Sequence, residues 1–309
     1  MQLFENSRAV RMVRADAAAG RLSHAYLFLC PDARNLRRWL KRLAAILLDA
    51  DGRAERLIEE ECYSDCRIFP APGEKAGVAE VRALLDDAYI KPVEGQRKVF
   101  VLDNVQDMLA PAQNKLLKVL EEPPANVYFL LGATGEYSVL TTVRSRTKRL
   151  ELLSFTEEET EAYLKEKYPH RTDTREIAAL SGGVLGRAEE LAEGDSLTQA
   201  AQEAARLLAT LSPAGIPAAV RAYADKGAAV QLLALLRLTL RDALAYKIGG
   251  VKRLSAADEE MLRRVAMRFS AAALVSAQEQ IARAEKNLKF NANLPMSLEE
   301  LFAGILEGR

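Results

Sequence analysis

The most constraining feature of the sequence is the run KVFVLDNVQDMLAPAQNKLLKVLEEPP at Lys98–Pro124. Its apolar residues Val99–Leu102 lead directly into Asp103. This is the pattern of a buried parallel strand that delivers a carboxylate to the carboxyl edge of a sheet, where ligands bind. A helical stripe follows and ends at Pro123-Pro124, because proline cannot continue a helix. The run is typical of an ATPase core, which requires a phosphate-binding loop elsewhere in the chain.

That loop is expected directly after the first strand, which we place at Tyr26–Cys30. A phosphate loop has the pattern GxxxxGK[ST], in which glycines let backbone N–H groups surround the anion while lysine and a hydroxyl contact phosphate and magnesium. The segment here, from Pro31 through Asp32 and Arg34 to Asn35, contains none of these residues. Asp32 would also point a negative charge at the phosphates. We therefore expect no nucleotide and no other cofactor at this chain's own site.

The composition sets wider limits. Lys plus Arg and Asp plus Glu both number 43, so no net charge draws the chain to nucleic acid or a membrane, and DNA contact would need a local patch or an assembly. Three cysteines, no secretory leader and no apolar run of spanning length predict a reducing, cytoplasmic location without membrane contact.

Strand and helix signals alternate in the first half, as in a parallel sheet with crossover helices. Helical stripes are predicted over Asn35–Leu48, Val78–Ala88 and Leu116–Leu120. The predicted strands are Tyr26–Cys30, Arg67–Phe69, Val99–Leu102, Val127–Leu131 and Lys148–Leu152. The sequence thus predicts an α/β domain with a five-stranded parallel sheet.

Strand signals stop after Leu152. Thr156 and Glu159 form a capping box that opens a small helical unit, and a polar stretch at Gly194-Asp195-Ser196 follows that unit. From Leu197 onward only helical periodicity is found. We predict three domains: a sheet domain at 1–154, a small helical domain at 155–195 and an all-α bundle at 196–309.

Several motifs give the chain a family resemblance. The segment Ala83–Thr134 closely resembles the clamp-loader subunits of bacterial DNA polymerase III, which have the AAA+ fold, a P-loop NTPase-like architecture. Further matching elements are SHAYLF at Ser23–Phe28, NKLLKVLEEPP at Asn114–Pro124, a Ser-Arg-Cys motif present as Ser145-Arg146-Thr147, GGVLGRAEEL at Gly182–Leu191 and an NxNL ending at Asn291–Leu294. The resemblance implies that the small helical domain is the AAA+ lid and the final bundle the oligomerisation collar.

Two branches of this family are relevant. The gamma/tau branch has an intact phosphate loop and a four-cysteine zinc module, whereas the delta-prime branch commonly lacks a working phosphate loop and keeps the Ser-Arg-Cys element. This chain looks like delta-prime. The resemblance implies a non-hydrolysing stator that assembles with gamma/tau and delta subunits, which bind ATP and Mg²⁺, to load the sliding clamp on primed DNA.

Within that resemblance, Arg146 is the expected functional residue, with Ser145 beside it. Its counterpart acts as an arginine finger in a neighbour's ATP site, where a permanently charged guanidinium that binds two oxygens stabilises charge on the γ-phosphate. The alternative is a surface arginine paired with a local carboxylate, in competition with Arg144 and Arg149.

The degenerate site contains two further residues. Asp103 would help to hold magnesium in an active site, but Asn104 cannot act as the adjacent base, so a turn cap or a pair with a basic residue is the expected role of Asp103. Arg187 matches the family's sensor position, and without a nucleotide it is expected to make a contact between lid and core.

Cys62 and Cys66 lie where the family carries its zinc module. Structural zinc takes four ligands, and only Cys30, His24 and His170 remain, all distant in sequence, so the ligand count argues against zinc.

Charged runs have simpler explanations. The acidic stretches Glu59–Glu61 and Thr156–Glu161 are expected as solvated helix starts. The basic cluster Arg34, Arg37, Arg38, Lys41 and Arg42 suits either DNA phosphates or a solvent-facing helix.

Two other function classes stay open: a gamma/tau-like motor with an atypical phosphate loop, and a helical adaptor unrelated to replication.

Overall fold

The structure is a computed structural model that describes residues 2–71, 74, 76–137, 139–194, 197–249, 257–289 and 293–307. Contacts divide the chain into two compact units. Unit 1 comprises Met1–Phe155 and Val184–Arg187, and unit 2 comprises Thr156–Gly183 and Ala188–Arg309. Parts of two predicted features, Asp195-Ser196 of the polar stretch and Asn291 with residue 292 of the NxNL ending, lie outside the described residues.

Unit 1 is built on a five-stranded sheet in the order β2-β3-β4-β1-β5, and every pairing is parallel. The strands are β1 Ala25–Leu29, β2 Cys66–Phe69, β3 Lys98–Leu102, β4 Val127–Ala133 and β5 Lys148–Glu151. All five predicted strands are confirmed, with ends that differ by a residue or two. The strands β1 and β3 are buried along their whole length. Burial on both faces explains why their sequences are continuous apolar runs.

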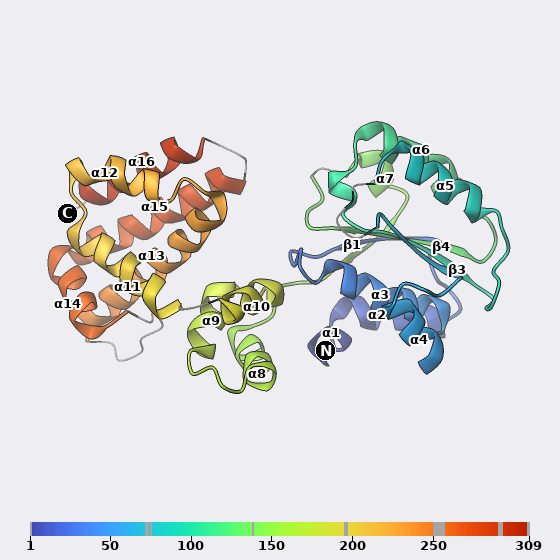
Figure 1. Cartoon of the computed structure of the whole chain (residues 1–309), viewed down its shortest axis with the longest axis horizontal. Coiled ribbons are helices and arrows are strands. Elements are labelled where there is room, and N and C mark those ends of the chain that lie inside the picture. The colour runs from blue at the N-terminus through green and yellow to red at the C-terminus, as the bar shows by residue number, and fades with distance from the viewer. Residues whose placement is uncertain are drawn as a thin grey trace. The chain divides into compact units, whose positions relative to one another are not determined.

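Helices cover both faces of this sheet (Figure 1). One face carries α1 Gln2–Glu5, α2 Arg8–Ala18, α3 Leu36–Leu48 and α4 Gly52–Glu59, and the other carries α5 Val78–Ala88, α6 Ala110–Glu121 and α7 Thr141–Arg144, with the 3₁₀ turn η1 Val105–Asp107 before α6. The three predicted helical stripes correspond to α3, α5 and α6. On the α3 face, Trp39 stacks on Phe4 with ring centroids 4.4 Å apart. On the opposite face, Leu116 and Val119 pack with Phe100 and Phe129 of the sheet.

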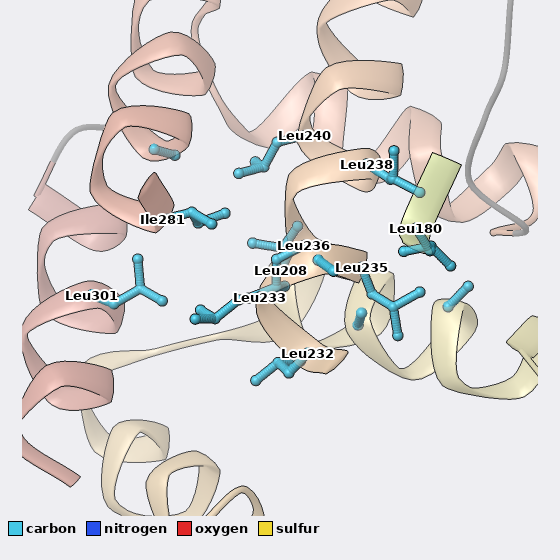
Figure 2. Close-up of a cluster of buried hydrophobic side chains, with 14 of the residues drawn as sticks. Leu180, Leu208, Leu232, Leu233, Leu235, Leu236, Leu238, Leu240, Ile281 and Leu301 are labelled. Carbon is cyan, nitrogen blue, oxygen red and sulfur yellow. The ribbon is translucent and has the colours of Figure 1, made fainter. Parts of the chain in front are cut away.

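Unit 2 contains only helices among its described residues. These are α8 Glu157–Lys167, α9 Thr174–Ser181, most of α10 Leu185–Glu193, α11 Leu197–Thr210, η2 Pro213–Gly215, α12 Ile216–Ala222, α13 Lys226–Lys247, α14 Glu259–Arg268, α15 Ala271–Lys289 and α16 Leu294–Glu307. Leu233, Leu236 and Leu240 of α13 lie in the middle of its core, together with Ile281 and Leu301 (Figure 2).

The capping box that opens α8 is confirmed. The hydroxyl of Thr156 accepts a hydrogen bond from the backbone N–H of Glu159 at 3.1 Å, and the Glu159 carboxylate accepts one from the backbone N–H of Thr156 at 2.9 Å. The main segment of unit 1 ends at Phe155, and Thr156, the N-cap of this helix, is the first residue of unit 2. The further division into a lid at 155–195 and a collar at 196–309 stays a prediction.

Across the described ranges, every helix is too short or too polar to cross a lipid bilayer.

Candidate functional site

The loop that follows β1 is closed by its own carboxylate. Asp32 is only 4% exposed, and its Oδ1 accepts a hydrogen bond from the backbone N–H of Asn35, the N-cap of α3, at 3.0 Å. Its Oδ2 accepts one from the Asn35 side-chain amide at 3.0 Å and one from the backbone N–H of Gly186 at 2.9 Å. Asp32 is therefore bound within unit 1 by backbone and side-chain donors.

Gly186 lies in the first turn of α10, in the segment that belongs to unit 1. A Cβ atom at this position would collide with the Asp32 carboxylate and would lie 2.7 Å from the Cβ atom of Arg34. Only glycine lets the start of α10 approach the loop this closely. The neighbouring Arg187 is half-buried in the same turn, while Pro31 and Arg34 are exposed.

A second charged cluster surrounds the acid at the end of β3. Asp103 is 6% exposed, and its Oδ2 lies 3.7 Å from a guanidinium nitrogen of Arg37, a residue of α3. The same guanidinium binds Glu61, with Nε and Nη2 2.7 and 2.5 Å from the two carboxylate oxygens, and donates to the carbonyl of Pro70 at 2.9 Å. Lys41 completes the cluster with an ion pair to Glu61 at 2.9 Å. Pairing with a basic residue, the predicted role of Asp103, is present.

Charge and burial shift the two acids in opposite directions. Hydrogen bonding from Arg37 lowers the pKa of Glu61 to about 2, although partial burial opposes the shift. Burial raises the pKa of Asp103 above its ordinary value, and the charge of Arg37 opposes this rise. Asp103 Oδ1 is buried and has no hydrogen-bond partner. The arginine is therefore shared between two acids and leaves one of them incompletely satisfied.

Two of the predicted charged runs need correction. Glu59–Glu61 is not a helix start: Glu59 ends α4, and Glu61 follows with a positive φ of 60° and binds Arg37 and Lys41. The basic cluster on α3 is not a free cationic face, because these contacts occupy Arg37 and Lys41, and Arg42 pairs with Glu55 at 3.8 Å. Local patterning missed both points because the partners lie on different elements.

Arg146 follows α7, next to Ser145, on the surface of unit 1. Its Nε and Nη2 atoms lie 2.8 and 2.5 Å from the carboxylate of Glu121, the last residue of α6. Its Nη1 donates to the carbonyl of Thr142 at 2.9 Å and to the hydroxyl of Ser145 at 3.3 Å. In the unassembled chain, Arg146 thus has the local carboxylate partner that the alternative interpretation required, and one third of its side chain (33%) stays exposed.

Sequence reasoning missed the residue that positions α7. Gln113 of α6 is 2% exposed; its amide donates to the carbonyl of Met108 at 3.0 Å and its oxygen accepts from the backbone N–H of Leu140, the N-cap of α7, at 2.9 Å. A buried glutamine with both ends bonded fixes the start of the turn that carries Ser145 and Arg146. A polar residue within the apolar stripe of α6 was the only available signal.

The cysteines considered as metal ligands differ in solvent exposure. Cys62 is exposed, whereas Cys66 at the start of β2 and Cys30 after β1 are buried, and all three are free thiols. Among the described residues, no group of three or more His, Cys, Asp or Glu side chains is placed to hold a metal ion.

The fold, together with the carboxyl edge of the sheet, defines the class of protein. A parallel sheet in this strand order, with an acid after β3 and a helix-opening loop after β1, is the P-loop type of α/β fold, here in its AAA+ form with helices after the sheet. The loop after β1 does not contain the GxxxxGK[ST] residues that bind phosphate.

Comparison with known proteins shows which family the sheet domain resembles. Residues 5–156 match the family model described as DNA polymerase III, delta subunit. A DNA polymerase III gamma/tau subunit from Mycobacterium tuberculosis is 34% identical over 142 residues, which cover 42% of this chain and 24% of that protein. A DNA polymerase III delta' subunit from Buchnera aphidicola is 37% identical over 91 residues, 29% of this chain and 27% of that protein. The sheet domain of this chain, residues 5–156, thus matches the clamp-loader subunits of DNA polymerase III.

These matches have limited extent. The chain spans about a quarter (24%) of the length of the first gamma/tau relatives. A solved gamma-subunit-related protein from Thermotoga maritima aligns over 99% of this chain and 97% of its own, at 17% identity and a TM-score of 0.44. That score is too low to establish a common domain arrangement.

Proposed function

We propose that this chain is a delta-prime-like subunit of the DNA polymerase III clamp loader. In this role it does not hydrolyse ATP, and it contributes Arg146 in trans to the ATP site of a neighbouring subunit. Its partners are gamma/tau and delta subunits, which supply ATP and Mg²⁺. The assembled loader opens the sliding clamp and places it on primed DNA during replication.

The observation that carries the proposal is the closed loop after β1. In a phosphate loop, backbone N–H groups at the start of the following helix point at the phosphates. Here the N–H of Asn35, at the start of α3, is bound to the buried carboxylate of Asp32. A nucleotide would have to displace a negative charge that is already hydrogen-bonded, and neither lysine nor glycine is present to compensate. These features support the proposal that this chain does not bind ATP.

The contact between Arg146 and Glu121 is compatible with a finger. Half of the Glu121 side chain (50%) and a third of the Arg146 side chain (33%) are exposed, and ion pairs at the surface contribute only about 0–1 kcal/mol. A nucleotide phosphate in a neighbouring subunit offers Arg146 more charge and a bidentate geometry. The guanidinium can therefore leave Glu121 at small cost when the neighbour binds ATP.

The test is a loader reconstituted with Arg146→Ala, assayed for DNA-stimulated ATP turnover. Arg149→Ala is the matched control, since Arg149 is an exposed arginine of β5 whose guanidinium pairs with Glu136 at 3.0 Å. We expect Arg146→Ala to slow turnover by about 10³-fold, the lower range for arginine fingers, with assembly unchanged by native mass spectrometry. Equal turnover in the two variant loaders would exclude the finger.

A gamma/tau-like motor is the second candidate, because gamma/tau subunits are among the relatives. A motor must bind nucleotide in its own right. Calorimetric titration of the isolated chain with MgATP distinguishes the two candidates, since micromolar binding by this chain would favour the motor.

A further inference from the structure

We propose that unit 1 carries built-in substitutes for the two charged parts of a magnesium nucleotide: the carboxylate of Asp32 replaces a phosphate group, and the guanidinium of Arg37 replaces the metal ion. This inference rests on the proposed function, in that it explains how a site without nucleotide is kept folded. Both side chains come from the loop and helix that follow β1.

The anion substitute lies at the starts of two helices. Asp32 accepts backbone hydrogen bonds from Asn35, which caps the 13-residue α3, and from Gly186 in the 9-residue α10. Helix starts carry free N–H groups and partial positive charge, and they stabilise an anion placed against them. At 4% exposure, the carboxylate cannot be replaced by water without opening the loop. Asp32 thus satisfies the groups that a phosphate would otherwise satisfy.

The cation substitute lies beside the acid that ends β3. A metal-holding acid is expected at this edge of the sheet, and Asp103 is in that position. The nearest cation is Arg37, at 3.7 Å, and it is fixed from the other side by Glu61 and by the carbonyl of Pro70. A buried carboxylate without a cation would be strongly destabilising. Arg37 therefore compensates the charge that magnesium would compensate in an active relative of this fold.

The close approach at Gly186 supports the same inference. Because any side chain there would collide with Asp32, the start of α10 and the loop are matched to each other with no room for a ligand between them. The site is complete without nucleotide, so the stability of unit 1 should not depend on one.

The test removes each substitute and asks whether the free ion restores stability. Trp39 is the only tryptophan of the chain and is buried in α3, so its fluorescence during thermal unfolding reports on unit 1 of the intact protein. We expect Asp32→Ala to lower the melting temperature by roughly 4–8 °C, and inorganic phosphate to restore part of this loss. Wild type should respond to phosphate only as it responds to other salts at equal ionic strength.

Asp51→Ala is the matched control, because Asp51 caps α4 through the N–H groups of Arg53 and Ala54 but is exposed. It should lose stability without a specific gain from phosphate. In the second arm, Arg37→Met should gain stability from Mg²⁺, whereas Arg53→Met, which removes an exposed pair with Glu94, should not. If Asp32→Ala fails to fold, Asp32→Asn replaces it, since it keeps the side-chain volume.

The outcomes separate this inference from the proposed function. If phosphate raises the melting temperature of Asp32→Ala no more than that of wild type and Asp51→Ala, the role of Asp32 as anion substitute is excluded. If Mg²⁺ raises the melting temperature of Arg37→Met no more than that of Arg53→Met, the role of Arg37 as cation substitute is excluded. Either result leaves the non-hydrolysing role intact if wild type still fails to bind MgATP. Micromolar MgATP binding by wild type would contradict both.

Discussion

The carboxylate of Asp32 accepts a hydrogen bond from the backbone N–H of Gly186, at 2.9 Å and 154 residues further along the chain. This bond joins the loop after β1 to the first turn of α10 within unit 1. The loop after β1 is therefore a closed structural element, because its carboxylate is bound by backbone N–H donors from two helix starts. The position where a phosphate loop would lie is thus occupied by internal hydrogen bonds.

Substitution of Gly186 tests the close approach directly. Gly186→Ala places a methyl group against the Asp32 carboxylate and should destabilise unit 1 by about 1–3 kcal/mol, the usual cost of overpacking a tight contact. The measurement is the Trp39 fluorescence transition in urea. Gly52→Ala is the control, because a Cβ atom there meets nothing within 4 Å. Equal urea midpoints for Gly186→Ala and Gly52→Ala would mean that the loop after β1 shifts to accommodate the methyl group without loss of stability.

Acid should remove the contribution of Glu61. Its pKa is about 2 in the folded protein against 4.5 in the unfolded chain, so its stabilisation is complete above pH 4.5 and is lost as the pH falls towards 2. Glu61→Gln should therefore unfold at lower temperature than wild type at pH 7, and the difference should shrink between pH 4.5 and 2. Glu60→Gln, an exposed neighbour, should follow wild type throughout. A difference independent of pH would contradict the assigned ion pair with Arg37.

Removing the amide of Gln113 should disturb the turn that carries Arg146. Gln113→Leu leaves the backbone N–H of Leu140 and the carbonyl of Met108 without this partner, at a cost of about 1–3 kcal/mol. We expect lower stability of unit 1 and, in the reconstituted loader, a partial form of the Arg146→Ala defect. Lys115→Ala, an exposed position on the same helix, serves as control. Wild-type ATP turnover with Gln113→Leu would show that α7 does not need this support.

The three cysteines should differ sharply in reactivity. Burial raises the pKa of Cys30 and of Cys66 to about 12, so neither forms a thiolate at neutral pH, whereas Cys62 is exposed. A chromogenic disulfide reagent should therefore titrate one thiol in the folded protein and three after denaturation. Cys62→Ser should abolish the fast reaction. Fast labelling of a second cysteine in the folded state would contradict the burial of β2 or of the loop after β1.

Much of unit 1 was predictable because its signals are local. The continuous apolar run Val99–Leu102 is buried in β3 as expected. In unit 2 the local capping box of Thr156 and Glu159 opens α8 in the same way. Charged residues were predicted less well. Glu61 was assigned to a solvated helix start and Arg37 to a basic cluster that suits DNA phosphates or a solvent-facing helix, although the two bind each other across 24 residues.

The sequence by itself determined the fold class, the positions of the five strands along the chain and the absence of the phosphate-loop pattern. Each of these depends on side-chain type at short spacing. Only the tertiary structure decided what Asp32, Arg37 and Arg146 contact. Their partners Gly186, Glu61 and Glu121 lie on other elements, and hydrogen bonds and ion pairs act over a few ångströms in space regardless of separation along the chain. The parallel sheet brings the loop after β1 and the acid after β3 to its carboxyl edge. It brings Glu121 and Arg146, which precede β4 and β5, to its amino edge.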